Sequence, residues 1–127
     1  MDIIAFDPGK TTGYCVFRLD PVEDPVLFDW GEIDDELVDK WNLSRLVQQN
    51  TVISESAVLT GRLNEDKVKQ IQITERIRFF ANSVGKQVHW VTPESKKLVK
   101  DVPDQIEGEH ARDAYRVAKA WLLRRKA

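Results

Sequence analysis

The sequence contains one cysteine and one methionine among its 127 residues. With Cys15 alone, a disulfide framework and a cysteine-based zinc site are both excluded within one chain. No stretch approaches the roughly 18 consecutive apolar residues of a membrane-spanning helix, so we expect no membrane partner. The N-terminal segment MDIIAFDPGK has no basic region before a long apolar run, so we expect no secretory signal and a cytoplasmic protein.

Positive charge is scarce in the first half of the sequence. Residues 1–66 hold five Lys or Arg and fourteen Asp or Glu, whereas residues 67–127 hold fourteen and seven. The net charge of −2 conceals this asymmetry. Only the second half can offer an electrostatic footprint to a phosphate backbone, although clustered charges on a solvated face are the simpler alternative.

The content of hydrophobic residues, 42%, is enough to bury a core. A chain of this length is expected to form a single domain over residues 1–127.

The hydrophobic pattern and the turn residues predict three strands, followed by strands that alternate with helices. The first part indicates an antiparallel meander and the second indicates two parallel strands. We therefore expect an α/β fold with a mixed five-stranded sheet and helices on both faces. The predicted strands are Ile3–Asp7, Thr12–Leu19, Val26–Ile33, Thr51–Ala57 and Gln87–Val91; the predicted helices run from Asp34-Asp35 to about Gln49, from the cap Asn64 to about Ser83, from Pro93 to Lys100 and from about Gly108 to Arg125.

The long helix after Asn64 has apolar residues on two sides. Its main stripe has 4-3-4 spacing, and Val68, Ile71 and Phe79 mark a second side. One side can pack on the sheet, and the other then requires a partner, which is either a second copy of the chain or another part of its own chain. We assign the main stripe to a dimer interface, formed by Ile73, Ile77, Phe80 and Val84.

Two acids lie on predicted strands. Glu55 is in the apolar segment TVISESAV, where a carboxylate is costly unless it is paired or binds a cation. Asp7 ends the first strand, on the same side as Ile3 and Ala5. A solvent-facing glutamate and an ordinary turn-forming aspartate before Pro-Gly are the simpler interpretations.

Two further candidates, His110 and Asp113, lie three residues apart at the start of the last helix, in EHARDAYRVAKAWL. That spacing puts both side chains on one side of the helix. Acids near a helix N-terminus also serve simply to complement the helix dipole. Taken together with Asp7 and Glu55, however, they form an oxygen-rich set that suits Mg²⁺ or Mn²⁺.

These segments resemble a known family. IIAFDPGKTTGYCVF is similar to the first strand and turn of RuvC-type Holliday junction resolvases, in the RNase H-like superfamily. VISES is similar to their acidic fourth strand, and HARDAYRVAKAWL to the motif of their last helix. The three motifs are short, but they occur in the family's order and span the chain, which looks like a short phage-type member from a bacterial or phage-infected cell.

The resemblance implies a role for each candidate. Asp7, Glu55, His110 and Asp113 would be the catalytic and metal-binding residues of a site with two Mg²⁺ or Mn²⁺ ions. The implied enzyme is a homodimeric crossover junction endodeoxyribonuclease. It would cut four-way junctions, and other branched DNA such as forks and flaps, to leave 5′-phosphate and 3′-hydroxyl ends.

The segment TPESKKLVK resembles the part of the family that carries phosphate-contacting lysines. Surface lysines that serve only solubility are the alternative. Leu59 and Arg62 follow the fourth predicted strand, where the family carries an aromatic wedge, and we add both to the expected DNA-binding surface. The full predicted set is Lys96, Lys97, Lys100, Arg112, Arg116, Leu59 and Arg62.

Three alternative functions stay open. FDPGKTTG also resembles the phosphate loop of actin-like ATPases, but those proteins close two domains around a nucleotide. The YqgF-like branch of the superfamily, small proteins of RNA processing, matches the short length. A non-catalytic DNA-binding module, in which the acids are structural, is the third. The chain also departs from the resolvases, because it is shorter than typical bacterial members and lacks the aromatic wedge, which puts junction selectivity in question.

Overall fold

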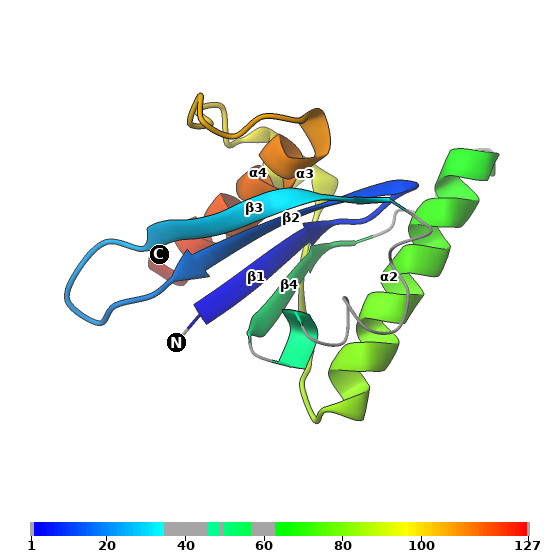
Figure 1. The fold of residues 1–127 in the computed structure, drawn as a ribbon, viewed down its shortest axis with the longest axis horizontal. Helices are drawn as coiled ribbons and strands as arrows, with labels where there is room; N and C mark the ends of the chain where they lie inside the picture. Colours follow the sequence, from blue (N-terminus) through cyan, green and yellow to red (C-terminus); the bar gives the residue numbers. More distant parts are fainter. Residues whose placement is uncertain (1, 35–45, 49, 57–62, 127) are drawn as a thin grey trace.

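A computed structural model of the chain describes residues 2–34, 46–48, 50–56 and 63–126. Its strands form one five-stranded sheet in the order β3-β2-β1-β4-β5, of which β3, β2, β1 and β4 can be followed in Figure 1. The elements are β1 (Asp2–Asp7), β2 (Thr11–Arg18), β3 (Val26–Asp34), β4 (Thr51–Glu55), α2 (Glu65–Ser83), β5 (Val88–Val91), α3 (Pro93–Lys97) and α4 (Glu109–Lys126).

The pairing confirms the predicted mixed sheet. β1, β2 and β3 form an antiparallel meander, while β4 pairs in parallel with both β1 and β5. β1 is central and fully covered, which explains its continuous apolar run from Ile3 to Phe6.

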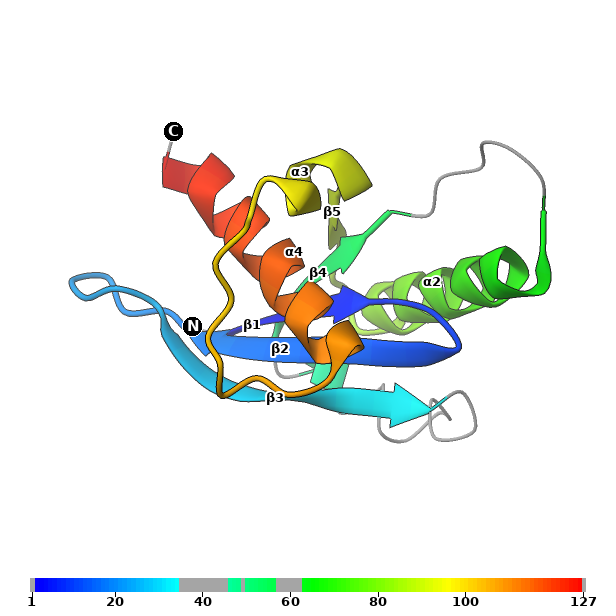
Figure 2. The ribbon, with the colours of Figure 1, turned by 90° about the horizontal axis from the view of Figure 1, so that it is seen from above.

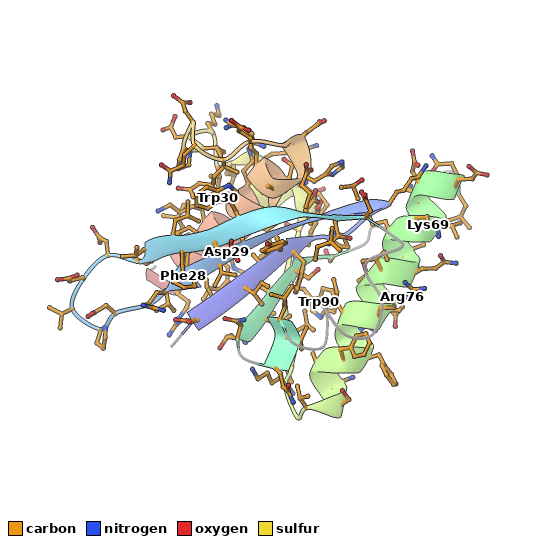
Figure 3. The ribbon with its side chains drawn as sticks, in the orientation of Figure 1. Phe28, Asp29, Trp30, Lys69, Arg76 and Trp90 are labelled. Carbon is orange, nitrogen blue, oxygen red and sulfur yellow. The ribbon has the colours of Figure 1, made fainter. Side chains whose placement is uncertain are left out.

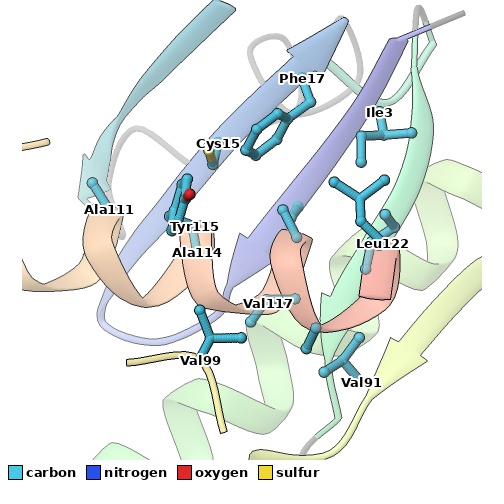
Figure 4. Packing of buried hydrophobic residues seen from close by; sticks show 14 of the residues in the cluster. Ile3, Cys15, Phe17, Val91, Val99, Ala111, Ala114, Tyr115, Val117 and Leu122 are labelled. Atoms are coloured by element: carbon cyan, nitrogen blue, oxygen red, sulfur yellow. The ribbon is translucent and has the colours of Figure 1, made fainter. Parts of the chain in front are cut away.

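The two faces of the sheet carry separate cores, because successive side chains of a strand point to opposite sides. Ile3 and Ala5 of β1 belong to a core with α4, in which Ala114 and Val117 allow close approach of the helix (Figure 4). Ile4 and Phe6 belong to a core with α2. Figure 2 shows α4 and α2 separated by the sheet, so helices cover both faces as predicted.

The predicted dimer stripe is wrong for two of its residues. Ile73 and Ile77 are fully buried in the core between α2 and the sheet, and Phe80 and Val84 pack partly against the same core. The stripe faces the sheet because it is the more continuous of the two apolar sides of α2. The second side is the exposed one, and it includes Phe79, which is 68% exposed.

Several element boundaries differ from the predictions. Asp34 ends β3 instead of opening a helix, and of the helix predicted to reach Gln49 the structure describes only residues 46–48, which are helical. α3 ends at Lys97, because the backbone then turns with hydrogen bonds from Leu98 and Val99 back to the carbonyls three residues earlier. Lys100 therefore lies outside the helix and does not share a helical face with Lys96.

Within the part of the chain that the structure describes, no helix is both long and apolar enough to cross a membrane.

Candidate active site

Asp7 and Glu55 lie next to each other at the ends of neighbouring parallel strands. β1 and β4 pair with Phe6 opposite Ser54, and one residue further each strand ends in its acid. Asp7 alternates along β1 with Ile3 and Ala5, and Glu55 alternates along β4 with Ile53. Both acids therefore point to the face of the sheet that α4 covers. They are buried, with exposed fractions of 8% for Asp7 and 4% for Glu55.

The turn after Asp7 is braced by Thr12. Its hydroxyl donates to the carbonyl of Gly9 at 3.2 Å and accepts from the Gly9 amide at 3.4 Å. This local bonding explains the DPGKTTG sequence, in which Pro8 and Gly9 reverse the chain and Thr12 closes the turn. The end of β1, and with it Asp7, is thereby held in place.

The N-terminal part of α4 brings the other two candidates to the same place. Nδ1 of His110 lies 3.6 Å from Oδ2 of Asp7. Asp113 accepts a hydrogen bond from Nη1 of Arg116 at 2.6 Å. The four residues that the sequence predicted as one site are therefore gathered by β1, β4 and α4.

Lys96 of α3 lies among the three carboxylates. Its ammonium nitrogen donates to Oε2 of Glu55 at 3.0 Å, and lies 3.7 Å from Oδ1 of Asp7 and 3.8 Å from Oδ2 of Asp113. The Lys96 side chain is only 15% exposed. We predicted Lys96 as a DNA contact on the surface, whereas the structure places it inside the acidic cluster.

The electrostatics of the cluster show in the pKa of Asp7. Burial raises this pKa, a hydrogen bond with Glu55 raises it further, and the Lys96 ammonium lowers it, with a net value of about 8. For Lys96, burial lowers the pKa, but the Asp7 and Glu55 carboxylates outweigh burial and the net shift is upward. The site thus keeps its lysine charged while one of its acids holds a proton near neutral pH.

The sequence analysis missed the residue that caps α4. Oε2 of Glu32, on β3, accepts a hydrogen bond from the His110 amide at 3.0 Å. A side chain added at Gly108, which has a φ of +90°, would also meet the Glu32 carboxylate. The sequence does contain a sign that the cap comes from elsewhere. In the segment EGEHARD, no Ser, Thr, Asp or Asn immediately precedes the helix to cap it.

Gly13 sets how closely α4 approaches the sheet. A Cβ at this position of β2 would overlap the backbone carbonyl of His110. Only glycine allows this contact. The glycine of the TTG segment in the first motif therefore sets the position at which the helix with His110 and Asp113 packs on the sheet.

A hollow of about 510 Å³ opens beside His110. It runs between the β1–β2 turn and the first turns of α2, and Lys10 and Lys67 lie on its wall. Its full lining is Pro8, Gly9, Lys10, Thr11, Asn64, Asp66, Lys67, Gln70 and His110.

The remaining predicted DNA contacts divide into three groups. Lys97 and Lys100 are exposed, as a DNA contact requires. Arg112 instead donates to the carbonyls of Pro103 and Ile106 at 3.2 and 3.1 Å, so it holds the loop before α4, and Arg116 is paired with Asp113. Leu59 and Arg62 lie outside the described residues.

The donor set matches a hard divalent cation, because three carboxylates and an imidazole converge in a buried site. The same site already holds the positive ammonium of Lys96. Among the described residues, however, no three acidic, histidine or cysteine side chains form a ready-made metal cluster. The position that lies within reach of all three carboxylates is that of the Lys96 ammonium.

No protein-family model and no curated protein sequence matches the chain. Its fold, however, is that of RuvC from Thermus thermophilus. The structure of T. thermophilus RuvC in complex with a Holliday junction substrate superimposes on the present chain with a TM-score of 0.72 and 15% sequence identity. The match covers 99% of the present chain and 95% of the RuvC chain. A second T. thermophilus RuvC structure gives the same TM-score and identity, over 99% and 96% of the two chains. The predicted RNase H-like fold of the RuvC type is therefore confirmed.

Proposed function

We propose that the chain is a divalent-metal-dependent endonuclease that cuts branched DNA, with four-way junctions as its first substrate. One observation carries the proposal: Asp7, Glu55 and Asp113, from three elements distant in sequence, surround a single cationic position in a RuvC-like fold. The fold of the junction-bound T. thermophilus RuvC supports the choice of substrate.

Each side chain has a role that follows from its place. Asp7, Glu55 and Asp113, whose carboxylates lie within 3.8 Å of one position, would hold the divalent ions. His110, within 3.6 Å of Asp7, would complete the ligand set or orient the attacking water. A bound pair of such ions activates a water and stabilises the leaving oxygen of a phosphodiester. Attack by water on the phosphorus, with cleavage of the P–O3′ bond and the 3′ oxygen as leaving group, would give a 5′-phosphate and a 3′-hydroxyl with no covalent intermediate.

The surroundings of the cluster fit a DNA strand. Lys97 and Lys100 are exposed on one side, and the hollow with Lys10 and Lys67 opens on the other. The acidic loop with Asp20, Glu23 and Asp24 lies instead beside Leu122 and Arg125, near the far end of α4. A negatively charged strand that reaches the cluster is thereby kept clear of this loop.

Resolution of a junction requires two cuts on opposing strands, so we also propose a homodimer. The outer side of α2 supplies the surface, since Val68 and Phe79 are exposed there. This replaces the inner stripe that the sequence suggested.

The test is cleavage of labelled DNA by the whole chain in Mg²⁺, Mn²⁺ or EDTA. The substrates are a synthetic four-way junction, a fork, a flap, a linear duplex and a structured RNA. We expect paired, metal-dependent nicks in the junction. Asp7→Asn should lower the rate by more than about 100-fold, because loss of even an outer partner of a metal ligand costs 10–100-fold. Asp2→Asn, at the opposite end of β1, is the matched control and should cut normally.

Other outcomes change the proposal in defined ways. Equal cutting of junction and fork would make the protein a general branch nuclease. Cutting of the RNA alone would favour an RNA-processing enzyme. Binding without cutting in any metal, by protein shown to be folded, would leave a non-catalytic DNA-binding module and overturn the proposal.

A further inference from the structure

The position among the three carboxylates is already taken by a positive group of the protein itself. The Lys96 ammonium lies 3.0, 3.7 and 3.8 Å from oxygens of Glu55, Asp7 and Asp113. Such a central position, almost shielded from water, is not that of a lysine that waits on the surface for a phosphate.

The backbone around Lys96 is fixed, whereas its side chain is not. Thr92 caps α3 by accepting from the Ser95 amide at 3.2 Å, and Pro93 occupies the first turn. The lysine reaches the cluster from this anchored helix through four methylene groups. Rotation within that chain lets the ammonium withdraw without any movement of α3.

A divalent ion and the ammonium exclude each other at this position. Mg²⁺ binds oxygens at about 2.0–2.1 Å and would use the same carboxylates. Two cations about 3–4 Å apart also repel each other strongly in a site with little water. Occupation by metal therefore requires that Lys96 first leaves the carboxylates.

We propose that Lys96 is a tethered cation that takes the place of the metal in the metal-free protein and competes with the metal for the same carboxylates. The inference rests on the proposed function, because it assumes that these carboxylates hold the ion. Two consequences follow. Lys96 stabilises the metal-free fold by offsetting the repulsion between Asp7, Glu55 and Asp113. It also lowers the affinity for the metal, because each binding event must displace it.

An ordinary buried ion pair is the competing explanation, and it makes different predictions. If Lys96 were only structural, its loss would destabilise the metal-free and the metal-bound protein alike, and metal affinity would stay equal or fall. If Lys96 competes with the metal, its loss destabilises the metal-free protein and strengthens metal binding.

The experiment compares the whole chain with Lys96→Met, which keeps an unbranched side chain close in length to the aliphatic part of lysine and removes the charge. Thermal unfolding is followed in EDTA and in rising concentrations of Mg²⁺ and Mn²⁺, and calorimetry gives the metal Kd without DNA. We expect a lower Tm in EDTA, a larger rise of Tm with metal and a Kd lower by roughly 5–150-fold, the usual range for coupled equilibria. Arg124→Met, which removes an exposed positive charge near the end of α4, is the matched control and should behave as the parent.

A second measurement covers the case in which Lys96→Met does not fold in EDTA. At about pH 9, where Asp7 and Lys96 of the parent are both charged, the double variant with Asp7→Asn leaves one carboxylate fewer to be neutralised. The loss of Lys96 should therefore lower the Tm less in the Asp7→Asn background than in the parent. An equal loss in both backgrounds would overturn the role of Lys96 as a counter-ion.

Failure of this inference is distinguishable from failure of the proposed function. If the parent binds metal and cuts junctions, while Lys96→Met binds metal with equal or weaker affinity, only the tethered-cation role is overturned. If the parent shows neither metal-dependent stabilisation nor cutting, the proposed function itself falls, and the inference falls with it.

Discussion

Asp7 is the residue at which burial and charge conflict. It ends the most buried strand of the protein, and its carboxylate lies beside those of Glu55 and Asp113. A residue chosen for stability alone would not be ionisable there. Sequence reasoning found Asp7 and Glu55 because an acid inside or at the end of an apolar strand needs a compensating partner, but it did not find that Lys96 is the partner.

The first prediction concerns the pH dependence of stability in EDTA. Burial, followed by the hydrogen bond with Glu55, raises the pKa of Asp7 from 3.8 to about 8. Between these values the folded protein keeps a proton that the unfolded chain has lost, so the free energy of unfolding falls as the pH rises from about 4 to about 8. The Asp7→Asn variant has no ionisable group at this position, so this decrease in the free energy of unfolding should be absent from it.

The advantage in Tm of Asp7→Asn over the parent should therefore widen by several degrees between about pH 5 and about pH 8. About 1 kcal/mol moves the Tm by roughly 4 °C in a domain of this size. Thermal unfolding followed by circular dichroism measures the gap. A gap that stays constant over this range would contradict the raised pKa.

At the scale of elements, α4 is the part of the fold that assembles the site. Its first two turns carry His110 and Asp113, and its position is set by Gly13 of β2 and Glu32 of β3. The helix itself was readable from its apolar periodicity. Its cap was not, because Glu32 precedes His110 by 78 residues and no local pattern links the two.

The second prediction tests this cap. Glu32→Ala should lower the free energy of unfolding by roughly 0.5–2 kcal/mol, the usual cost of a lost N-cap. It should also slow junction cutting, because the start of α4 loses its attachment to β3. Glu32→Gln keeps an acceptor oxygen and should retain most of both properties. Urea unfolding and the cleavage assay provide the readouts.

Glu23→Ala, in the acidic loop far from the start of α4, is the control for a lost negative charge. An equal effect of Glu23→Ala and Glu32→Ala on cutting would show that general charge, and not the cap, is responsible.

At the scale of the whole molecule, acidic and basic side chains lie mainly on different elements. β3 and α2 lie on opposite sides of the view in Figure 3, with Phe28 and Trp30 labelled on the strand and Lys69 and Arg76 on the helix. The basic second half of the sequence supplies α2, α3 and α4, which surround the site, whereas the described acids of the first half lie mainly on β3 and the loop before it. The charge asymmetry of the sequence is thus spatial as well.

The third prediction concerns assembly. Phe79→Glu puts a charge on the exposed side of α2 and should shift a dimer to a monomer by at least tenfold in Kd, without loss of fold. Val22→Asp, at a position 92% exposed in the acidic loop, is the matched control and should leave the dimer intact. Analytical ultracentrifugation measures both.

Paired cuts in a junction should become independent single nicks in the Phe79→Glu variant, since each site then acts alone. If the parent is a monomer at micromolar concentration and still makes paired cuts, the proposed dimer surface is wrong.

The sequence by itself determined the mixed sheet, because strand and helix periodicities differ and the turn residues mark where each element ends. It also identified Asp7, Glu55, His110 and Asp113, because ionisable groups in these apolar or helix-starting contexts are unusual. Only the tertiary structure decided which side of α2 faces the sheet, where Lys96 points and what caps α4. These features depend on contacts between residues far apart in the sequence, such as Lys96 with Asp7, 89 positions away, and His110 with Glu32, 78 positions away. Such contacts leave no periodic trace in the sequence, because each is set by the packing of whole elements and not by the residues beside it.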